Sequence, residues 1–222
     1  MLTEKIKQAL SLLSTPLIVD SMEELGLKEY LLDPKFKPIV PYSKMIGTAI
    51  TVEIEQNNNK EAANLDLLSK AYETHHNVLN PIISISVPTS LSKSSIFGSV
   101  ASIRAQMGGF SGALIGGSVR DTQELMKSNF PIFSNSISPG RITGLVSAKS
   151  TGDPIQIGGV NISQGNIVFG DNDGVIILPE SKLSNIVDLA FEINTWEGEL
   201  KSFLTQGANY EQVIELIGKS PK

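Results

Sequence analysis

The stretch GALIGGSVRDTQEL, residues 112–125, brings together residue types that could hold a metal ion and an anionic substrate. Asp121 and Glu124 are hard oxygen donors of the kind that Mg²⁺ or Mn²⁺ prefers. Arg120 carries a permanent charge, and its planar fork matches a carboxylate. Two glycines just upstream allow a sharp turn and would leave the site open. The spacing therefore makes these three side chains candidates for metal-assisted chemistry on an anion.

The same residues also fit a purely structural pattern. Asp121 followed by Glu124 three positions later is a capping box, in which the Asp121 side chain would accept a backbone N–H at a helix start. The motif alone does not choose between a helix cap and metal ligands, so both interpretations stay open.

A second candidate feature lies at residues 98–101, within the stretch IFGSVASIRAQMGG. Gly98, Ser99, Val100 and Ala101 open a predicted helix, and the free N–H groups of a helix start form a natural anion pocket. If the next strand runs beside this helix, the pocket and Arg120 could hold one carboxylate from two sides. A glycine-started structural helix is the alternative.

Other common chemistries lack their residues. The two histidines, His75 and His76, are adjacent at the end of a predicted helix and point about 100° apart, which suits a metal clamp poorly. The chain has no G-x-S-x-G elbow, no phosphate-binding loop and no dinucleotide fingerprint. Lys93 lies in a polar loop, which favours a solvated lysine, and a Schiff-base lysine is the alternative that stays open. GDNDG at 170–174 indicates a hairpin turn, because the closing glutamate of a calcium loop is absent.

The bulk composition narrows the class of protein. The chain has 222 residues, of which 41% are hydrophobic and 18% charged, and a formal net charge of −5 without a basic cluster. A nucleic-acid partner is therefore not expected. Zero cysteines exclude thiol catalysis and zinc–thiolate sites. Neither a signal peptide nor a membrane span is predicted, so we expect a cytoplasmic protein.

The pattern along the chain predicts strands that alternate with helices after a helical N-terminal quarter. Residues 14–26 have helical spacing, with Thr15 as N-cap, Pro16 at the first helical position and Gly26 past the end. The later rhythm indicates βα units around a partly parallel sheet. In that region, strands are expected at 45–55, 81–87, 112–117 and 131–133, and helices at 61–73, 98–109 and 120–128.

The last third of the chain changes character. Residues 153–180 are short β runs punctuated by glycine and predict a small antiparallel meander. Residues 181–204 place apolar side chains on one stripe of a long helix, which needs a partner. We expect a single domain over 1–222, with a core at 14–180 and a C-terminal helical segment at 181–222.

Four of these segments, taken together, resemble the family that joins class II pyruvate aldolases, acting on 4-hydroxy-4-methyl-2-oxoglutarate, to the regulator of ribonuclease activity A. The resemblance runs from about Ser14 to Glu180, and Gly98 and Arg120 stand at the family's spacing. It rests on the opening helix, the first strand segment, a Gly-x-x-Arg-Asp-x-x-Glu signature and a glycine-rich closing segment, at 14–26, 37–52, 116–124 and 153–179.

This resemblance implies an α/β fold of the swivelling β/β/α type, with layered mixed sheets, flanking helices and a long C-terminal helix. It implies homotrimers or homohexamers with active sites at subunit interfaces. Gly98, Ser99, Val100 and Ala101 would bind the carboxylate of a 2-oxo acid, and Arg120 would contact the keto oxygen. Asp121 would ligate Mg²⁺ or Mn²⁺ directly, and Glu124 would hold a metal-bound water. Glu197 matches a glutamate that reaches the site of an adjacent subunit.

The implied activity is a metal-dependent lyase that cleaves a 4-hydroxy-2-oxo acid to pyruvate through a metal-stabilised enolate. Decarboxylation of oxaloacetate passes through the same enolate. Arg120 and Asp121 would be the catalytic residues. A non-catalytic regulator that binds a ribonuclease or another protein is the alternative. A related enzyme with a different substrate is also open, because Ser99 stands where the aldolase branch usually has an acid.

Overall fold

The computed structural model describes residues 1–28, 30–57, 71, 77–142 and 146–221. Its centre is a mixed nine-stranded sheet in the order β1-β6-β5-β3-β2-β10-β11, with β4 beside β5 and β7 beside β2. The strands are β1 (Lys37–Pro38), β2 (Met45–Gln56), β3 (Pro81–Ser86), β4 (Ser95–Phe97), β5 (Gly112–Val119), β6 (Ile132–Ile137), β7 (Val146–Thr151), β10 (Ile167–Asp171) and β11 (Gly174–Leu178).

The middle of the sheet is parallel, as the βα rhythm predicts. Strand β2 runs parallel to β3, β3 to β5, and β5 to both β4 and β6. β3 is buried along nearly its whole length, which explains its unbroken apolar character. Because parallel strands end at the same edge of a sheet, the residues that follow β4 and β5 emerge side by side. In the register, Phe97 of β4 faces Val119 of β5.

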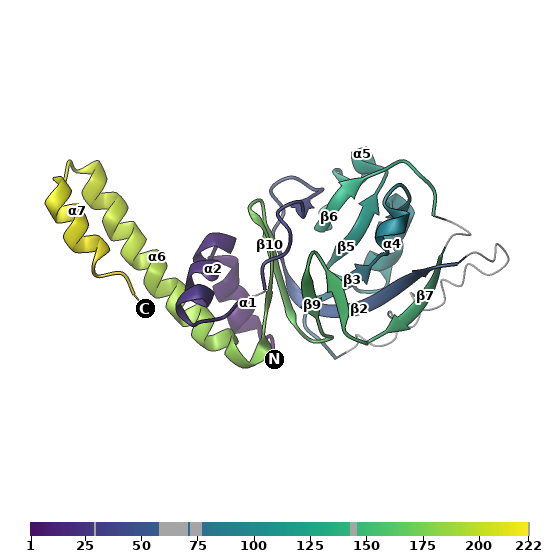
Figure 1. Ribbon diagram of the computed structural model, residues 1–222, viewed down its shortest axis with the longest axis horizontal. Coiled ribbons are helices and arrows are strands. Elements are labelled where there is room, and N and C mark those ends of the chain that lie inside the picture. Colours follow the sequence, from purple (N-terminus) through teal and green to yellow (C-terminus); the bar gives the residue numbers. More distant parts are fainter. Residues whose placement is uncertain (29, 58–70, 72–76, 143–145, 222) are drawn as a thin grey trace.

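Helices cover the sheet in two groups. The first group, α4 (Ser99–Met107) and the short α5 (Thr122–Leu125), lies beside β5 and β6 (Figure 1). The second group lies against β10 and β11 at the other end of the body and consists of α1 (Glu4–Ser11), α2 (Thr15–Glu24) and α6 (Leu183–Thr205). The expected α/β class, the mixed sheet, the flanking helices and the long C-terminal helix are all confirmed.

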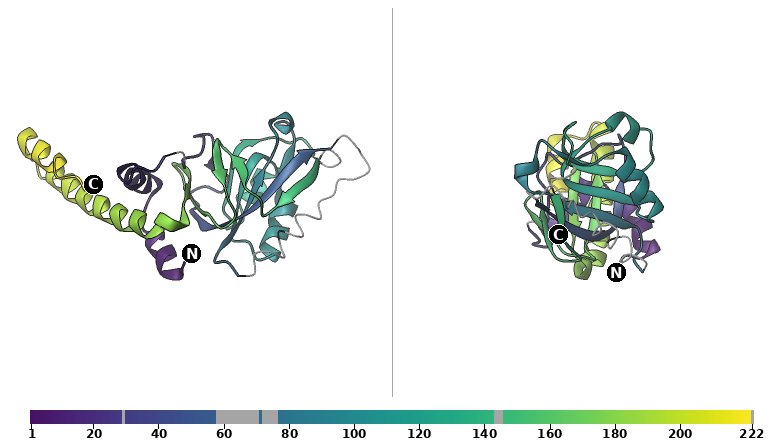
Figure 2. Two further views of the ribbon diagram at one scale, coloured as in Figure 1. Left: turned by 60° about the horizontal axis from the view of Figure 1, so that its bottom comes forward. Right: turned by 90° about the vertical axis from the view of Figure 1, so that its right-hand side faces the viewer.

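Helix α6 packs on the body only along its first half. Ile186 and Ile193 are buried against the α1–α2 group, as the apolar stripe predicts, whereas Phe203 near the end of α6 is 43% exposed. That end projects from the body together with α7 (Tyr210–Ile217), which folds back on it (Figures 1 and 2). Trp196 on α6 fastens this hairpin, because its Nε1 donates a hydrogen bond to the Leu216 carbonyl at 2.9 Å.

Three local predictions need correction. The helix expected at 120–128 is only α5, and β5 extends to Val119 instead of ending at 117. The expected meander is two separate hairpins. One hairpin, β8 (Ile155–Ile157) with β9 (Val160–Ile162), forms its own sheet, whereas β10 leaves it and pairs with β2. The helix expected at 61–73, apart from residue 71, and both His75 and His76 lie outside the described residues.

The expected hairpin turn at 170–174 is confirmed, and it also fixes α2. Asp171 pairs with Gly174 across the turn of β10 and β11. The Asp171 carboxylate accepts hydrogen bonds from the backbone N–H of Thr15 at 2.8 Å and from the Thr15 hydroxyl. Helix α2 therefore starts one residue earlier than expected, with Ser14 at the N-cap position, Thr15 as the first helical residue and a distant aspartate in place of a local cap. Within the described ranges, every helix is too short or too polar to cross a bilayer.

Candidate functional site

The parallel pair β4–β5 brings residues 98 and 120 together. The backbone N–H of Arg120 donates to the Phe97 carbonyl at 3.0 Å, which extends the strand pairing to the point where both chains turn. Gly98 then opens α4, and Asp121 stands before α5. The sequence predicts a shared pocket if a strand runs beside the start of the helix, and the structure has this arrangement.

Asp121 is a helix cap, but for a different helix from the one predicted. It occupies the N-cap position of α5, yet its side chain makes no capping hydrogen bond there. Instead, its Oδ2 accepts hydrogen bonds from the Ser99 backbone N–H at 3.1 Å and from the Ser99 hydroxyl at 3.2 Å, at the start of α4. The reason is a left-handed backbone, with φ 57° and ψ 33°, which turns the carboxylate away from α5. The capping-box prediction is wrong in this respect.

Ser99 is well suited to its contact with Asp121. Its hydroxyl is a donor to the Asp121 carboxylate, whereas an acidic residue at position 99 would bring a second negative charge to the same oxygen. The serine therefore stabilises Asp121 in its position above the helix start, while the carboxylate remains 36% exposed.

Gly98 is required for the close approach of Asp121. A Cβ atom at position 98 would lie 2.6 Å from Asp121 Oδ2 and 3.1 Å from Arg120 Cγ. We expect Gly98→Ala to displace the carboxylate and to lower the free energy of unfolding by about 1–3 kcal/mol, as overpacking does. Denaturant unfolding measures this. Gly198→Ala on α6 is the matched control, because a Cβ there meets nothing within 4 Å. An equal loss in both variants would contradict the steric account.

Five of the predicted site residues line one cavity of about 180 Å³, here called the α4–β5 cavity: Gly98, Val100, Ala101, Arg120 and Asp121. The first α-helical hydrogen bond of α4 runs from the Ser102 N–H to the Gly98 carbonyl at 2.9 Å. The N–H groups of Val100 and Ala101 precede that bond, so they are the donors that a bound carboxylate could use. The Ser99 N–H is taken by Asp121.

Glu124 lines a neighbouring cavity, of about 460 Å³, whose wall includes Arg120, Asp121 and Ser138; we call it the α5 cavity. Arg120 and Asp121 line both cavities and separate them. The Arg120 Nε lies 3.8 Å from Asp121 Oδ2. Glu124 also lines a third cavity, of about 230 Å³, together with Ser99 and Ser102 of α4, so it lies close to the first turn of that helix.

The described residues fit a magnesium-type site and do not fit a zinc-type cage. Among them, no group of three histidine, cysteine, aspartate or glutamate side chains is close enough to enclose an ion. Zinc normally takes three or four protein ligands, whereas Mg²⁺ keeps several waters and needs one or two carboxylates. Asp121, partly exposed between two cavities, supplies one such carboxylate.

Two cations of the α4–β5 cavity, Arg104 and Arg141, were not among the sequence candidates. Arg104 lies on α4, and Arg141 lies in the segment that follows β6 and forms a bridge with Ser95. The sequence alone could have drawn attention to both residues, because Arg104, Arg120 and Arg141 are the three arginines of the whole chain.

Glu197 lies away from these cavities within one chain. It is on α6, where Lys201 makes an ion pair with it at 2.5 Å. It is also close enough to Asp20 of α2 to raise the pKa of that carboxyl, although burial is the larger cause. Glu197 therefore does not join Asp121 in the same subunit, and its action on an adjacent subunit stays a prediction.

The raised pKa of Asp20 gives a pH-dependent prediction. The folded state holds this proton more tightly than the unfolded state, so ionised Asp20 destabilises the fold once the pH rises above its ordinary value of 3.8 and through the raised value. We expect Asp20→Asn to raise the melting temperature at pH 7 and to leave it unchanged near pH 3. Thermal unfolding at the two pH values checks this. A stabilisation of equal size at both would exclude ionisation as the cause.

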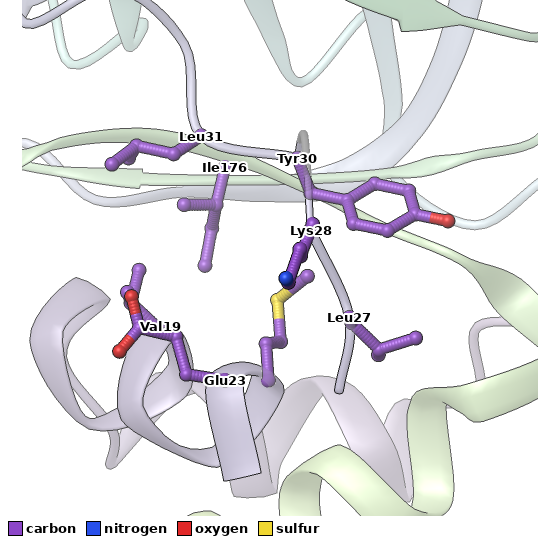
Figure 3. Close-up of a pocket in the computed structure, with 8 residues that line it drawn as sticks. Val19, Glu23, Leu27, Lys28, Tyr30, Leu31 and Ile176 are labelled. Carbon is purple, nitrogen blue, oxygen red and sulfur yellow. The ribbon is translucent and has the colours of Figure 1, made fainter. Parts of the chain in front are cut away.

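The apolar cavity of about 410 Å³ between α2 and β11 is not the chemical site (Figure 3). Its wall includes Met22, Leu27, Leu31 and Ile176, and the charged residues that line it are Glu23 and Lys28. It lacks the convergent polar groups that a small oxo acid needs, although its volume exceeds that of the α4–β5 cavity. We therefore assign the site from the residues that line each cavity and not from the cavity volume.

The family model RraA-like, described as Aldolase/RraA, matches residues 15–177, which is most of the chain. The chain belongs to the RraA-like family. The matched range contains both halves of the site, the start of α4 and the Arg120–Asp121 turn. The RraA-like family joins proteins named as aldolases to proteins named as inhibitors of ribonucleases.

Individual relatives of the RraA-like chain come from several organisms. Protein DlpA of Legionella pneumophila is 26% identical over 205 residues, which are 89% of this chain but only 31% of DlpA. A Halalkalibacterium halodurans protein provisionally named a 4-hydroxy-4-methyl-2-oxoglutarate aldolase is 29% identical over 69% of each chain. The solved structure of Streptomyces coelicolor RraAS2, from the RNase ES inhibitor RraA family, superposes with a TM-score of 0.77 at 21% identity and covers 90% of this chain and 97% of its own. That likeness confirms the fold.

Proposed function

We propose that this RraA-like chain is a divalent-metal-dependent lyase that cleaves a 4-hydroxy-2-oxo acid to pyruvate. One observation carries the proposal: the start of α4, Arg120 and Asp121 line the same small cavity, so an anion pocket, a fixed cation and a carboxylate converge. The aldolase name of the H. halodurans relative supports the same class of reaction. Mg²⁺ or Mn²⁺, held by Asp121, would polarise the keto oxygen of the substrate as a Lewis acid.

The residues of the chain have distinct tasks in this reaction. The N–H groups of Val100 and Ala101 hold the C1 carboxylate, and Arg120 donates to the C2 keto oxygen. The C4 hydroxyl loses its proton, the C3–C4 bond breaks, and the electron pair moves to the C2 oxygen as an enolate. Arg120 stabilises that developing negative charge most strongly in the transition state. Protonation of C3 then gives pyruvate, and C4 leaves as a carbonyl.

Water is the proton carrier in this proposal. Of the described residues that line the α4–β5 cavity, none is a histidine or a lysine, and Asp121 is the one carboxylate. Glu124, on the α5 side of Asp121, is suited to hold a water there by hydrogen bonding. Oxaloacetate would lose CO₂ through the same enolate, so we include its decarboxylation in the proposed activity.

We also propose a homotrimer or homohexamer in which Glu197 completes the site of an adjacent subunit. The exposed apolar residues Val100, Ile103 and Met107 on α4 support a protein contact beside the cavity, because they are 70%, 56% and 84% exposed and share roughly one face of the helix. The same three side chains are the observation that favours the alternative function, a regulator that binds a ribonuclease or another protein.

Exchange of the methyl protons of pyruvate for deuterium tests the enzyme. We expect exchange, followed by NMR, in the presence of Mg²⁺ or Mn²⁺ and its loss on addition of EDTA, because enolate formation is the shared half-reaction. Restoration by excess metal separates chelation from unfolding. Absence of exchange with either metal would exclude a pyruvate-enolate site and favour the regulator.

A further inference from the structure

The cavity of about 410 Å³ between α2 and β11, here called the α2–β11 cavity, is framed by fixed backbone. Just after α2, Gly26 has a left-handed φ of 69°, which ends the helix, and the Leu27 N–H donates to the Met22 carbonyl at 2.8 Å. Further along, the Ile177 N–H of β11 donates to the Tyr30 carbonyl at 2.9 Å. The segment after α2 is therefore anchored both to the helix end and to the sheet edge, and it cannot move inwards to fill the space between them.

The bottom of the α2–β11 cavity is apolar, and its opening is charged. Ile176 and Met22 are 0% and 4% exposed. Glu23 and Lys28, by contrast, are exposed, and Lys28 points from the segment after α2 towards the helix (Figure 3). The volume falls within the range of about 300–1,000 Å³ that is typical of ligand cavities, so the apolar part can take a large aliphatic or aromatic group.

The two charges at the opening have no partners of their own. Among the residues that the structure describes, neither the Glu23 carboxylate nor the Lys28 amine forms an ion pair. The two groups have opposite signs and come from different elements, α2 and the segment that follows it. A ligand that complements both must carry one positive and one negative group in addition to an apolar body.

The end of α2 shows where the positive group of such a ligand belongs. Glu23 and Glu24 both lie in the last turn of α2, which contains no basic residue. The C-terminal end of a helix carries partial negative charge, so carboxylates are unfavourable there and a cation is favourable. An ammonium group beside Glu23 would therefore relieve a repulsion that the helix itself leaves uncompensated. The negative group of the ligand would then lie beside Lys28.

Ligands with a single kind of charge fit the α2–β11 cavity less well. A fatty acid would bring its carboxylate to Lys28 but would leave the negative end of α2 uncompensated, and an apolar amine would do the reverse. A dicarboxylic acid suits neither the apolar bottom nor Glu23. A zwitterion with one large apolar substituent complements all three parts of the cavity.

We propose that the α2–β11 cavity binds a free α-amino acid with a large apolar side chain. The ammonium group contacts Glu23, and the carboxylate contacts Lys28. The side chain packs on Met22, Leu31 and Ile176. The cavity lies at the other end of the body from α4 and α5, so this binding is separate from the proposed lyase site and does not rest on it (Figure 1). Binding would fasten α2 to β11 and stabilise the fold by mass action.

Calorimetric titration of the intact protein with L-leucine tests the proposal, and L-phenylalanine is the second probe. We expect a Kd below about 1 mM for at least one of the two. L-Alanine lacks the large side chain and should bind at least about tenfold more weakly, because each buried CH₂ group contributes about fourfold. 4-Methylpentanoate is leucine without its ammonium group, and 3-methylbutylamine is leucine without its carboxylate. Each should bind about three- to tenfold more weakly than leucine.

Two variants pair with these truncated ligands. Glu23→Gln should weaken L-leucine about three- to tenfold and should not weaken 4-methylpentanoate, which has no ammonium group. Lys28→Gln should weaken L-leucine by a similar factor and should not weaken 3-methylbutylamine, which has no carboxylate. Glu55→Gln and Lys35→Gln are the matched controls, because both residues are exposed and lie outside the cavity, and they should change no ligand. Thermal unfolding without ligand confirms that every variant is folded.

Three outcomes would overturn the proposal. If L-leucine binds no tighter than both truncated ligands, or if neither charge variant weakens it, the cavity takes apolar groups without recognising an amino acid. If neither amino acid binds and Leu31→Glu, at a side chain that is 53% exposed, lowers the oligomeric state in light scattering, the cavity is a contact between copies of this chain. Absence of binding with an unchanged oligomeric state contradicts the proposal as well. Proton exchange in pyruvate should be the same in Glu23→Gln and Lys28→Gln as in the unaltered protein, so the lyase is tested independently.

Discussion

Arg120→Ala is expected to lower the rate of metal-dependent proton exchange in pyruvate by about 10²–10³-fold, which is the typical effect of removing one donor to a developing oxyanion. The fold should be little affected. The Arg120 side chain is 43% exposed, and its ion pair with Asp121 is long, at 3.8 Å. Exposed ion pairs of this kind contribute about 0–1 kcal/mol, and the backbone bond from Arg120 to Phe97 does not involve the side chain.

A matched control exists for this variant. Lys149 also makes an exposed ion pair, with Glu53 at 3.0 Å, but it lies on β7 away from both cavities. Lys149→Ala should therefore lose a similar amount of stability without loss of exchange. Normal exchange in Arg120→Ala, with metal still required, would show that another group stabilises the enolate.

Asp121→Asn is expected to raise the Mg²⁺ concentration needed for half-maximal exchange by about 100-fold or more, because even residues behind a metal ligand affect affinity 10–100-fold. Asparagine tolerates the left-handed backbone, and its carbonyl can still accept the two hydrogen bonds from Ser99. The loss of stability should therefore be at most about 1 kcal/mol. Metal titrations of exchange, together with denaturant unfolding, measure both effects.

Asp171 offers the control, because its carboxylate also accepts a backbone N–H from the first turn of a helix, that of Thr15. Asp171 also accepts the Asp173 N–H at 2.9 Å, so Asp171→Asn should destabilise the protein at least as much. It should leave the metal titration unchanged, since no cavity of the candidate site includes Asp171. If Asp121→Asn behaves in the same way, Asp121 is a cap and nothing more.

Much of the candidate site could be predicted because its parts are local. A run of apolar residues followed by Arg120 and Asp121 predicts a strand end, and Gly98 predicts a helix start with free N–H groups. The alternation of strands and helices predicts that such ends meet at one edge of a parallel sheet. These expectations describe the convergence of Gly98, Arg120 and Asp121 correctly.

The remainder depends on tertiary register, which spacing does not encode. The choice of Asp121 between the N–H groups of α5 and those of α4 follows from one left-handed residue and from the pairing of β4 with β5. Arg141 reaches the cavity through a contact between Gly140 and Lys93, residues 47 positions apart. The pairing of β10 with β2 likewise joins segments that lie far apart in the sequence. The chemical roles of all the candidate site residues, Glu124 and Glu197 included, stay predictions.

Trp196 lies between α6 and α7, where its indole N–H donates a hydrogen bond to the Leu216 carbonyl, so tryptophan fluorescence can be used to follow the α6–α7 hairpin separately from the rest of the molecule. Trp196 is the single tryptophan of the chain, so intrinsic indole emission reports on the hairpin. A change in emission upon mixing two samples, or upon dilution, would then track association or release at the projecting arm.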